Sequence, residues 1–272
     1  MFFFKKKPSS NKPQFSVELY CVGHKPPVFD VSPDFCLVSP DANAAGLHIA
    51  DDAMGERFDG KILSEYTQLF GLADHLAGRA DLPQRLFFFQ YRKFLSPRPG
   101  ATRSTNMPYV YAAPPKEAAS LFPGVNVMTA ASRDFVRGPA FNVGVSMARG
   151  YALSHVREDF DGFAMALREV DGFTEQRCER FINSSILIPA PSLCMVPTDF
   201  FLQTTAVLRQ AWDIFSTHHY KPREGYQRRV GGFLLERLHS YLMQEYLMDN
   251  PLDDKQWEQI IVSDTAQINP TI

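Results

Sequence analysis

The chain has 272 residues, of which 45% are hydrophobic and 21% are charged, and its formal net charge is −2. This length can bury a substantial core and the balance is that of a globular protein, so we expect one large domain. The near-neutral charge argues against a nucleic-acid-binding protein. No stretch of the sequence approaches the roughly 18 apolar residues of a membrane span.

In residues 1–14, Met1 is followed by three Phe and then by three Lys. A signal peptide places its charges before a longer apolar run, so the order here does not predict one. We expect a disordered N-terminal tail. The alternative is a weak anchor, in which the Phe side chains insert into a membrane and the Lys side chains face anionic lipid.

The four cysteines form no CxxC pair and have no histidine cluster beside them. A metal site or a disulfide framework is therefore not expected, and we predict small, buried, free thiols. This cysteine usage is typical of a reducing compartment. We expect a cytoplasmic protein, with a position at the inner face of the membrane as the alternative if residues 1–14 anchor it.

Several segments have the patterns of strands. Residues 15–22 alternate apolar and polar side chains before they become continuously apolar, and residues 86–89 (LFFF) are apolar throughout, as in a strand buried on both faces. The further predicted strands are 35–38, 125–128 and 193–196. Residues 96–123, rich in Pro, Ala and Ser, are predicted to form a long loop.

Other segments repeat their apolar residues at helical spacing. The predicted helices are 62–76, 159–170, 174–182, 198–217 and 229–248. Strands followed by helices, with no internal repeat, predict a single layered α/β domain over residues 15–250, with a helical C-terminal region. Residues 251–272 are expected to be a polar tail, in which Trp257, Ile260 and Ile261 could dock.

Two predicted strands end in polar residues. His24 and Lys25 follow residues 15–22, and Gln90-Tyr91-Arg92-Lys93 follows residues 86–89. In α/β sheets, ligands bind outside the carboxyl ends of the strands. Arg92 could hold a diphosphate through paired hydrogen bonds and Tyr91 could stack on a sugar or a base. The alternative is that both groups are solvated strand ends.

Acidic residues give weaker signals. Glu236 falls close to the apolar stripe of the last predicted helix, where an unpaired carboxylate would be costly, so it should pair with an Arg or serve in a site. Asp159-Phe160-Asp161 matches a DxD string, but we interpret it as a helix start because no apolar strand precedes it. The pair Asp51-Asp52 is weakly suggestive of a site for Mg²⁺ or Mn²⁺.

Several separated segments together resemble the glycosyltransferases of capsular-polysaccharide synthesis. Residues 89–94 (FQYRKF) resemble the His-Tyr-Arg-Arg box of that family, with Gln90 in place of its His and Lys93 in place of its second Arg. The other similar segments, in the family's order, are residues 21–26, 64–67, Tyr151 with His155 and Asp159, Asn183 with 194–196, and residues 229–237. The resemblance implies a GT-A-like, Rossmann-type mixed sheet flanked by helices.

The resemblance also implies an enzyme that transfers a sugar, of the hexosyl type, from a nucleotide-diphosphate donor. The acceptor would be a glycan or lipid-linked glycan of a bacterial capsule or lipopolysaccharide. The expected donor-binding residues are His24, Lys25, Tyr91, Arg92, Lys93 and Arg229. The candidate catalytic bases are Glu236, Asp199 and Asp159, in that order.

Two other classes of function fit the sequence. One is a non-catalytic nucleotide- or glycan-binding subunit of a polysaccharide assembly complex, which the changes at Gln90 and Lys93 keep open. The other is an α/β interaction protein without a small ligand. The donor sugar, the linkage and the dependence on a metal are open from sequence.

Overall fold

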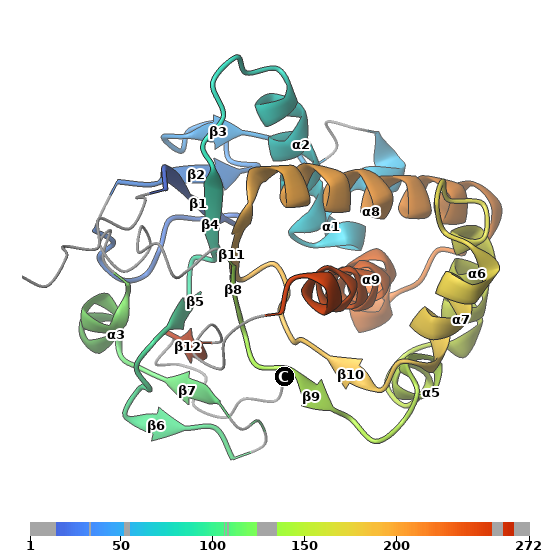
Figure 1. Cartoon of the computed structure of the whole chain (residues 1–272). Helices are drawn as coiled ribbons and strands as arrows, with labels where there is room; N and C mark the ends of the chain where they lie inside the picture. Colours follow the sequence, from blue (N-terminus) through green and yellow to red (C-terminus); the bar gives the residue numbers. More distant parts are fainter. Residues whose placement is uncertain are drawn as a thin grey trace, which may run out of the picture.

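The computed structural model describes residues 15–32, 34–51, 55–105, 107, 109–123, 135–251 and 258–263. Its main feature is a six-stranded mixed sheet in the order β3-β2-β1-β4-β11-β8 (Figure 1). The strands are β1 (Val17–Val22), β2 (Cys36–Ser39), β3 (Leu47–His48), β4 (Arg85–Phe89), β8 (Val136–Arg137) and β11 (Cys194–Pro197). Strands β1 to β4 are parallel to one another, and β11 is antiparallel to both β4 and β8.

The pattern of β4 explains its central place in the sheet. Successive side chains of a strand point to opposite faces, so a run of apolar residues needs two apolar layers. Leu86 and Phe88 lie in the core beneath the helices, whereas Phe87 and Phe89 lie in a second core on the other face. The predicted burial of residues 86–89 on both faces is confirmed, as is the α/β fold class.

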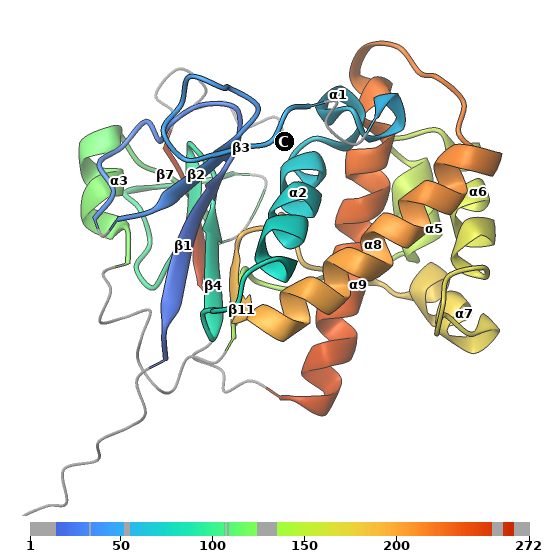
Figure 2. The ribbon, with the colours of Figure 1, turned by 90° about the horizontal axis from the view of Figure 1, so that it is seen from above.

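Helices cover one face of the main sheet, and Figure 2 shows α2, α8 and α9 on that side. The helices on this side of the sheet are α1 (Gly60–Leu63), α2 (Tyr66–Ala77), α5 (Met147–Ala152), α6 (Arg157–Leu167), α7 (Glu175–Asn183), α8 (Thr198–His218) and α9 (Val230–Asp249), with α5, α6 and α7 beyond α8 and α9 (Figure 2). The helix α7 begins as predicted, because the Thr174 hydroxyl accepts a hydrogen bond from the Arg177 backbone N–H.

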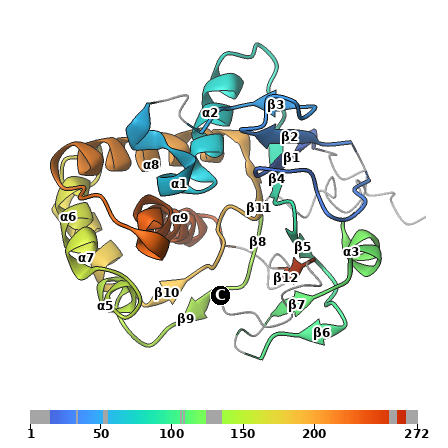
Figure 3. The ribbon, with the colours of Figure 1, turned by 180° about the vertical axis from the view of Figure 1, so that it is seen from behind.

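The predicted helix 62–76 is in fact two helices. Ser64 ends α1 with a φ of 58°, a left-handed conformation, and α2 starts at Tyr66. The start of α9 packs against this break (Figure 3). A Cβ on Gly231 would lie 2.4 Å from Leu63 Cδ2, and one on Gly232 would lie 2.6 Å from Ser64 Oγ. The two glycines therefore allow α9 to approach α1 closely.

A second sheet covers the other face of the main sheet and corrects the prediction of a long loop at 96–123. Its order is β5-β12-β7-β6, and α3 (Pro115–Leu121) packs beside it. The strands are β5 (Lys93–Ser96), β6 (Thr102–Arg103), β7 (Val110–Ala112) and β12 (Gln259–Val262). The last strand, β12, lies within the expected tail and buries Ile260 and Ile261. A two-stranded ribbon, β9 (Phe141–Asn142) with β10 (Ile186–Leu187), completes the strands described.

The tail at 1–14 and the strand predicted at 125–128 lie outside the described residues. The four cysteines are free thiols, and Cys21, Cys178 and Cys194 are buried. Among the described residues, no helix combines the length and the apolar character that crossing a membrane requires.

Candidate functional site

A polar cavity of about 450 Å³ opens at the carboxyl ends of β1 and β4. The two strands are paired in parallel, from Val17 with Arg85 to Cys21 with Phe89. The residues that follow them therefore meet at the same end of the sheet. Figure 2 shows α1 and the start of α9 at this same end of the molecule. The charged and amide side chains of the lining are His24, Asp51, Lys61, Glu65, Gln68, Gln90, Arg92, Lys93 and Arg229.

The residues after β4 form a tight turn between the two sheets. The backbone N–H of Gln90 donates to the carbonyl of Lys93 at 2.8 Å, and the N–H of Lys93 donates to the carbonyl of Gln90 at 3.1 Å. The chain thus reverses from β4 into β5, and Tyr91 and Arg92 occupy the tip of the turn. Four polar residues follow a buried strand because this turn forms the rim of the cavity.

The side chains at the two strand ends lie around the Tyr91 ring. The His24 ring meets it edge-on, with 4.9 Å between the ring centroids, and Lys25 Nζ lies 4.5 Å from the Tyr91 centroid. The Arg92 guanidinium carbon lies 5.4 Å from the same centroid. The pKa of His24 is lowered by partial burial and by the charges of Lys25 and Arg92. This part of the site is therefore a cationic rim around one aromatic ring.

Lys93 lines the cavity as the last residue of the turn. Burial lowers the pKa of its amine, and Glu65 and Glu236 oppose this effect while Arg92 and Arg229 add to it. The amine is thus within electrostatic reach of two carboxylates and two guanidinium groups. Such a mixed-charge centre could bind a multiply charged anion while it keeps a carboxylate near the bound ligand.

Glu65 is a lining residue that the site prediction missed. Its Oε1 accepts hydrogen bonds from Gln90 Nε2 at 3.1 Å and from the Ser192 hydroxyl at 3.0 Å. These contacts tie the start of α2 to the turn after β4 and to the approach to β11. The one sequence signal was the place of Glu65 in the segment 64–67, which contributed to the resemblance but was given no role.

Arg229 reaches the cavity from the start of α9. Its Nε donates to Ser64 Oγ at 3.0 Å, at the break between α1 and α2. The close approach that Gly231 and Gly232 permit brings these two residues together. Lys61, on α1, adds a further cation to the same wall.

Glu236 lies just outside the lining, nearly two turns after Arg229 on α9. Its Oε1 accepts a hydrogen bond from the Ala190 backbone N–H at 3.0 Å. It is half-buried and acts electrostatically on both Lys93 and Arg237. The hydrogen bond comes from a backbone N–H and not from an Arg side chain, which was one of the two possibilities expected from the sequence. The electrostatic effect of the carboxylate on Lys93 keeps Glu236 a candidate base.

The other two candidate bases are not brought to the cavity. Asp199 is exposed in the first turn of α8, where its Oδ1 accepts a hydrogen bond from the Phe200 N–H. Because β11 is antiparallel to β4, its end pairs with Arg85 and lies at the opposite edge of the sheet. Asp159 is buried on α6 and paired with Arg223, whose Nη2 and Nε donate to its two oxygens at 2.8 and 3.2 Å.

Acidic residues of the described part do not assemble a metal site. No group of three or more His, Cys, Asp or Glu side chains with suitable geometry occurs among the described residues. Asp51 lines the cavity, and its Oδ1 accepts from Gln68 Nε2 at 2.9 Å. Asp52 lies outside the described residues. Asp161 pairs with Arg157 on the surface of α6.

Comparison with known proteins gives one informative match. No protein-family model matches the chain, and no curated protein sequence matches it. The fold is similar to that of WbbM, a bifunctional glycosyltransferase solved in its apo form, with a TM-score of 0.72 over 92% of this chain and 16% sequence identity. The chain spans 45% of the length of that structure. At this identity the similarity shows a shared fold.

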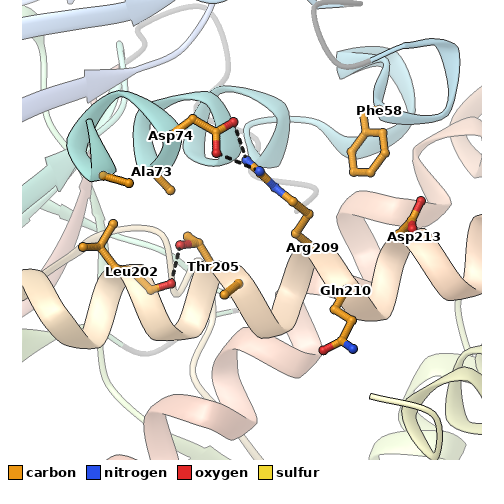
Figure 4. A pocket seen from close by; sticks show the side chains of 10 residues that line it. Phe58, Ala73, Asp74, Leu202, Thr205, Arg209, Gln210 and Asp213 are labelled. Carbon is orange, nitrogen blue, oxygen red and sulfur yellow. Dashed lines mark hydrogen bonds and ion pairs between the residues drawn. The ribbon is translucent and has the colours of Figure 1, made fainter. Parts of the chain in front are cut away.

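A second hollow, of about 630 Å³, lies between α2 and α8 (Figure 4). Its central charges are already paired, because Arg209 donates to both carboxylate oxygens of Asp74 at 2.8 and 2.9 Å. Much of the remaining lining is apolar, with Phe58 and Leu202 among its residues. Within the described residues, this hollow thus has one cation in its lining, Arg209, whereas the cavity at the strand ends has Lys61, Arg92, Lys93 and Arg229.

Proposed function

We propose that this protein is a glycosyltransferase that moves a sugar from a nucleotide-diphosphate donor to a bacterial surface polysaccharide. The observation that carries the proposal is the convergence of Arg92, Lys93 and Arg229 in one cavity at the carboxyl ends of parallel strands. Ligands of open α/β sheets bind at this position. The similarity in fold to a bifunctional glycosyltransferase supports the same class of reaction, with a GT-A-like donor site.

In such a transfer, the bond between the sugar and the diphosphate breaks and negative charge accumulates on the leaving diphosphate. Cations that are already in place stabilise that charge without a cost of reorganisation. An arginine such as Arg92 or Arg229 can offer two parallel N–H donors to phosphate oxygens, and Lys93 adds a compact charge to the same cavity. The three cations therefore have the role of holding the donor and its leaving group.

The acceptor hydroxyl must lose a proton as it attacks the sugar. In an inverting transfer, one carboxylate takes this proton. We assign that role to Glu236. Its Oε1 accepts a hydrogen bond from the Ala190 N–H, and its charge acts on the Lys93 amine. Glu65 is instead engaged by Gln90 and Ser192, which suits a positioning role for the turn that carries Arg92.

The test is nucleotide binding followed by donor turnover. Thermal-shift measurements with UDP, GDP and dTDP should show stabilisation by at least one of them, and the matching nucleotide sugars should release the diphosphate. In Arg92→Ala, nucleotide affinity should fall about ten- to one-hundred-fold, the worth of a charge-assisted hydrogen bond. The control is Arg103→Ala, which removes an exposed Arg on β6 and should have no effect.

Each negative outcome has its own meaning. If no nucleotide shifts the midpoint of the wild-type protein, the proposal is wrong. If a nucleotide binds but no donor turns over in the presence of glycan acceptors, the protein is a non-catalytic binding subunit. Turnover in Arg92→Ala equal to that of the wild type would remove the leaving-group role from Arg92.

A further inference from the structure

Three aromatic rings from separate elements stack beside the cavity, outside its lining. His155, before α6, lies with its ring centroid 4.1 Å from that of Phe233 on α9, at an interplanar angle of 24°. Tyr226, in the 3₁₀ helix η2 (Gly225–Arg229), lies 4.9 Å from Phe233 and 6.1 Å from His155. We call these three residues the aromatic platform.

The platform presents an open ring to solvent. Tyr226 is 61% exposed, although large apolar side chains gain free energy from burial. One side of its ring packs on Phe233, so the remaining surface is available for a ligand. An exposed aromatic residue alone is ordinary, but an ordered stack that continues into the core is a surface held ready for stacking.

Hydrogen bonds fix the platform in place. Gln227 Nε2 donates to the Ser154 carbonyl at 3.0 Å, and its Oε1 lies 3.3 Å from His155 Nδ1. Gly225 has a φ of 55°, which favours glycine and lets the chain enter η2 just before Tyr226. Burial and the charge of Arg237 lower the pKa of His155, so its imidazole is neutral at physiological pH. Because the surface is already fixed, little conformational entropy is lost at the platform when a ligand binds.

The platform adjoins the cavity through Arg229. The guanidinium carbon of Arg229 lies 5.6 Å from the Phe233 ring centroid, while its Nε is bound to Ser64 at the cavity wall. Phe233 and Glu236 are three residues apart on α9 and are neighbours on its surface. The proposed base is thus a neighbour of the aromatic platform on α9 and also acts electrostatically on Lys93 of the cavity.

We propose that the aromatic platform is the acceptor subsite, where a neutral sugar residue of the acceptor glycan stacks on Tyr226. This inference rests on the proposed function. The C–H face of a pyranose ring is apolar and suits an aromatic ring, whereas its hydroxyl groups need polar partners at the edge. Arg229 and Glu236 supply such groups on the side of the cavity. No separate cation is needed to hold a neutral sugar, and a base that neighbours the platform and acts on Lys93 suits a transfer to an acceptor bound there.

The experiment measures the binding of simple sugars to the full chain without any nucleotide. Saturation-transfer NMR with methyl glycosides of glucose, galactose, mannose and N-acetylglucosamine should detect weak binding of at least one, at about millimolar affinity. Tyr226→Ala should weaken that binding about ten-fold, as expected for the loss of one aromatic contact. Tyr226→Phe keeps the ring and should bind as the wild type does.

Nucleotide binding is measured on the same variants and separates this inference from the proposed function. Tyr226→Ala should bind the nucleoside diphosphates with unchanged affinity. If it loses nucleotide affinity instead, the platform belongs to the donor and the inference is wrong. Equal sugar binding by wild type and Tyr226→Ala, or no binding of any glycoside to the wild type, would also overturn it. Sugar binding at Tyr226 in a chain that binds no nucleotide would leave a glycan site and reject the transferase.

Discussion

The ion pair between Asp159 and Arg223 allows a test of whether Asp159 acts in the fold or in catalysis. Asp159 is 3% exposed and accepts two hydrogen bonds from Arg223, of which the side chain is 24% exposed. Removing one partner of a buried ion pair typically costs 3–5 kcal/mol. Because water reaches part of Arg223 and because Asn keeps one acceptor, we expect Asp159→Asn to lower the free energy of unfolding by about 2 kcal/mol.

This loss should be visible in both chemical and thermal unfolding. For a chain of this size, 1 kcal/mol corresponds to roughly 2–4 °C in Tm, so the midpoint should fall by about 4–8 °C. The matched control is Asp161→Asn, two residues further along α6, whose pair with Arg157 is largely exposed. That variant should lose less than about 1 kcal/mol. Donor turnover, measured well below both midpoints, should stay within about two-fold of wild type in each variant because neither residue lines the cavity.

The opposite pattern would refute the reasoning. If Asp159→Asn unfolds at the wild-type midpoint but its turnover is lost, Asp159 acts in the reaction rather than in the fold. A double variant, Asp159→Asn with Arg223→Gln, adds a further check. Its loss of stability should be smaller than the sum of the two single losses, since both singles break the same pair.

Two further predictions concern α9. Gly232→Ala places a methyl group where a Cβ would lie 2.6 Å from Ser64 Oγ, so Ser64 must shift and its hydrogen bond with Arg229 should weaken. Urea unfolding should show that the free energy of unfolding falls by about 1–2 kcal/mol, and the KM for the donor should rise. Burial lowers the pKa of His239 from its ordinary value of 6.5 to about 3, so protonation favours the unfolded chain and stability should fall as the pH drops below about 6.5. His239→Leu should remove up to about 1.4 kcal/mol per pH unit from that slope, and an unchanged slope would contradict the assignment.

The parts of the fold that the sequence predicted well are those with long periodic patterns. The strands β1 and β4 and the helices α8 and α9 were found within a few residues of their bounds, because each buries a continuous face. The second sheet was missed for a physical reason. Its strands β6 and β7 are only two and three residues long, and β7 pairs with β12, which lies about 150 residues later. Such pairing leaves no local pattern.

The site was predictable where it depends on parallel strands. The residues after β1 and β4 meet because those strands run in the same direction, and Arg229 joins them through the close contact of α9 with α1. The same reasoning fails for Asp199, since β11 runs in the opposite direction. Strand direction is a property of the whole sheet, so the residues that follow one strand do not reveal it.

The contact between Gln90 and Glu65 bears on the two positions, Gln90 and Lys93, at which the chain differs from the His-Tyr-Arg-Arg box that it resembles. A side-chain amide donates a hydrogen bond at every physiological pH, whereas a histidine in the same position would titrate near neutrality. Gln90 therefore keeps a donor toward Glu65 but gives up a group that could exchange protons with the ligand. Lys93 likewise keeps the positive charge of an Arg without its planar fork of donors. Gln90 thus suits positioning rather than proton transfer, and under the proposed function the base is Glu236 on α9.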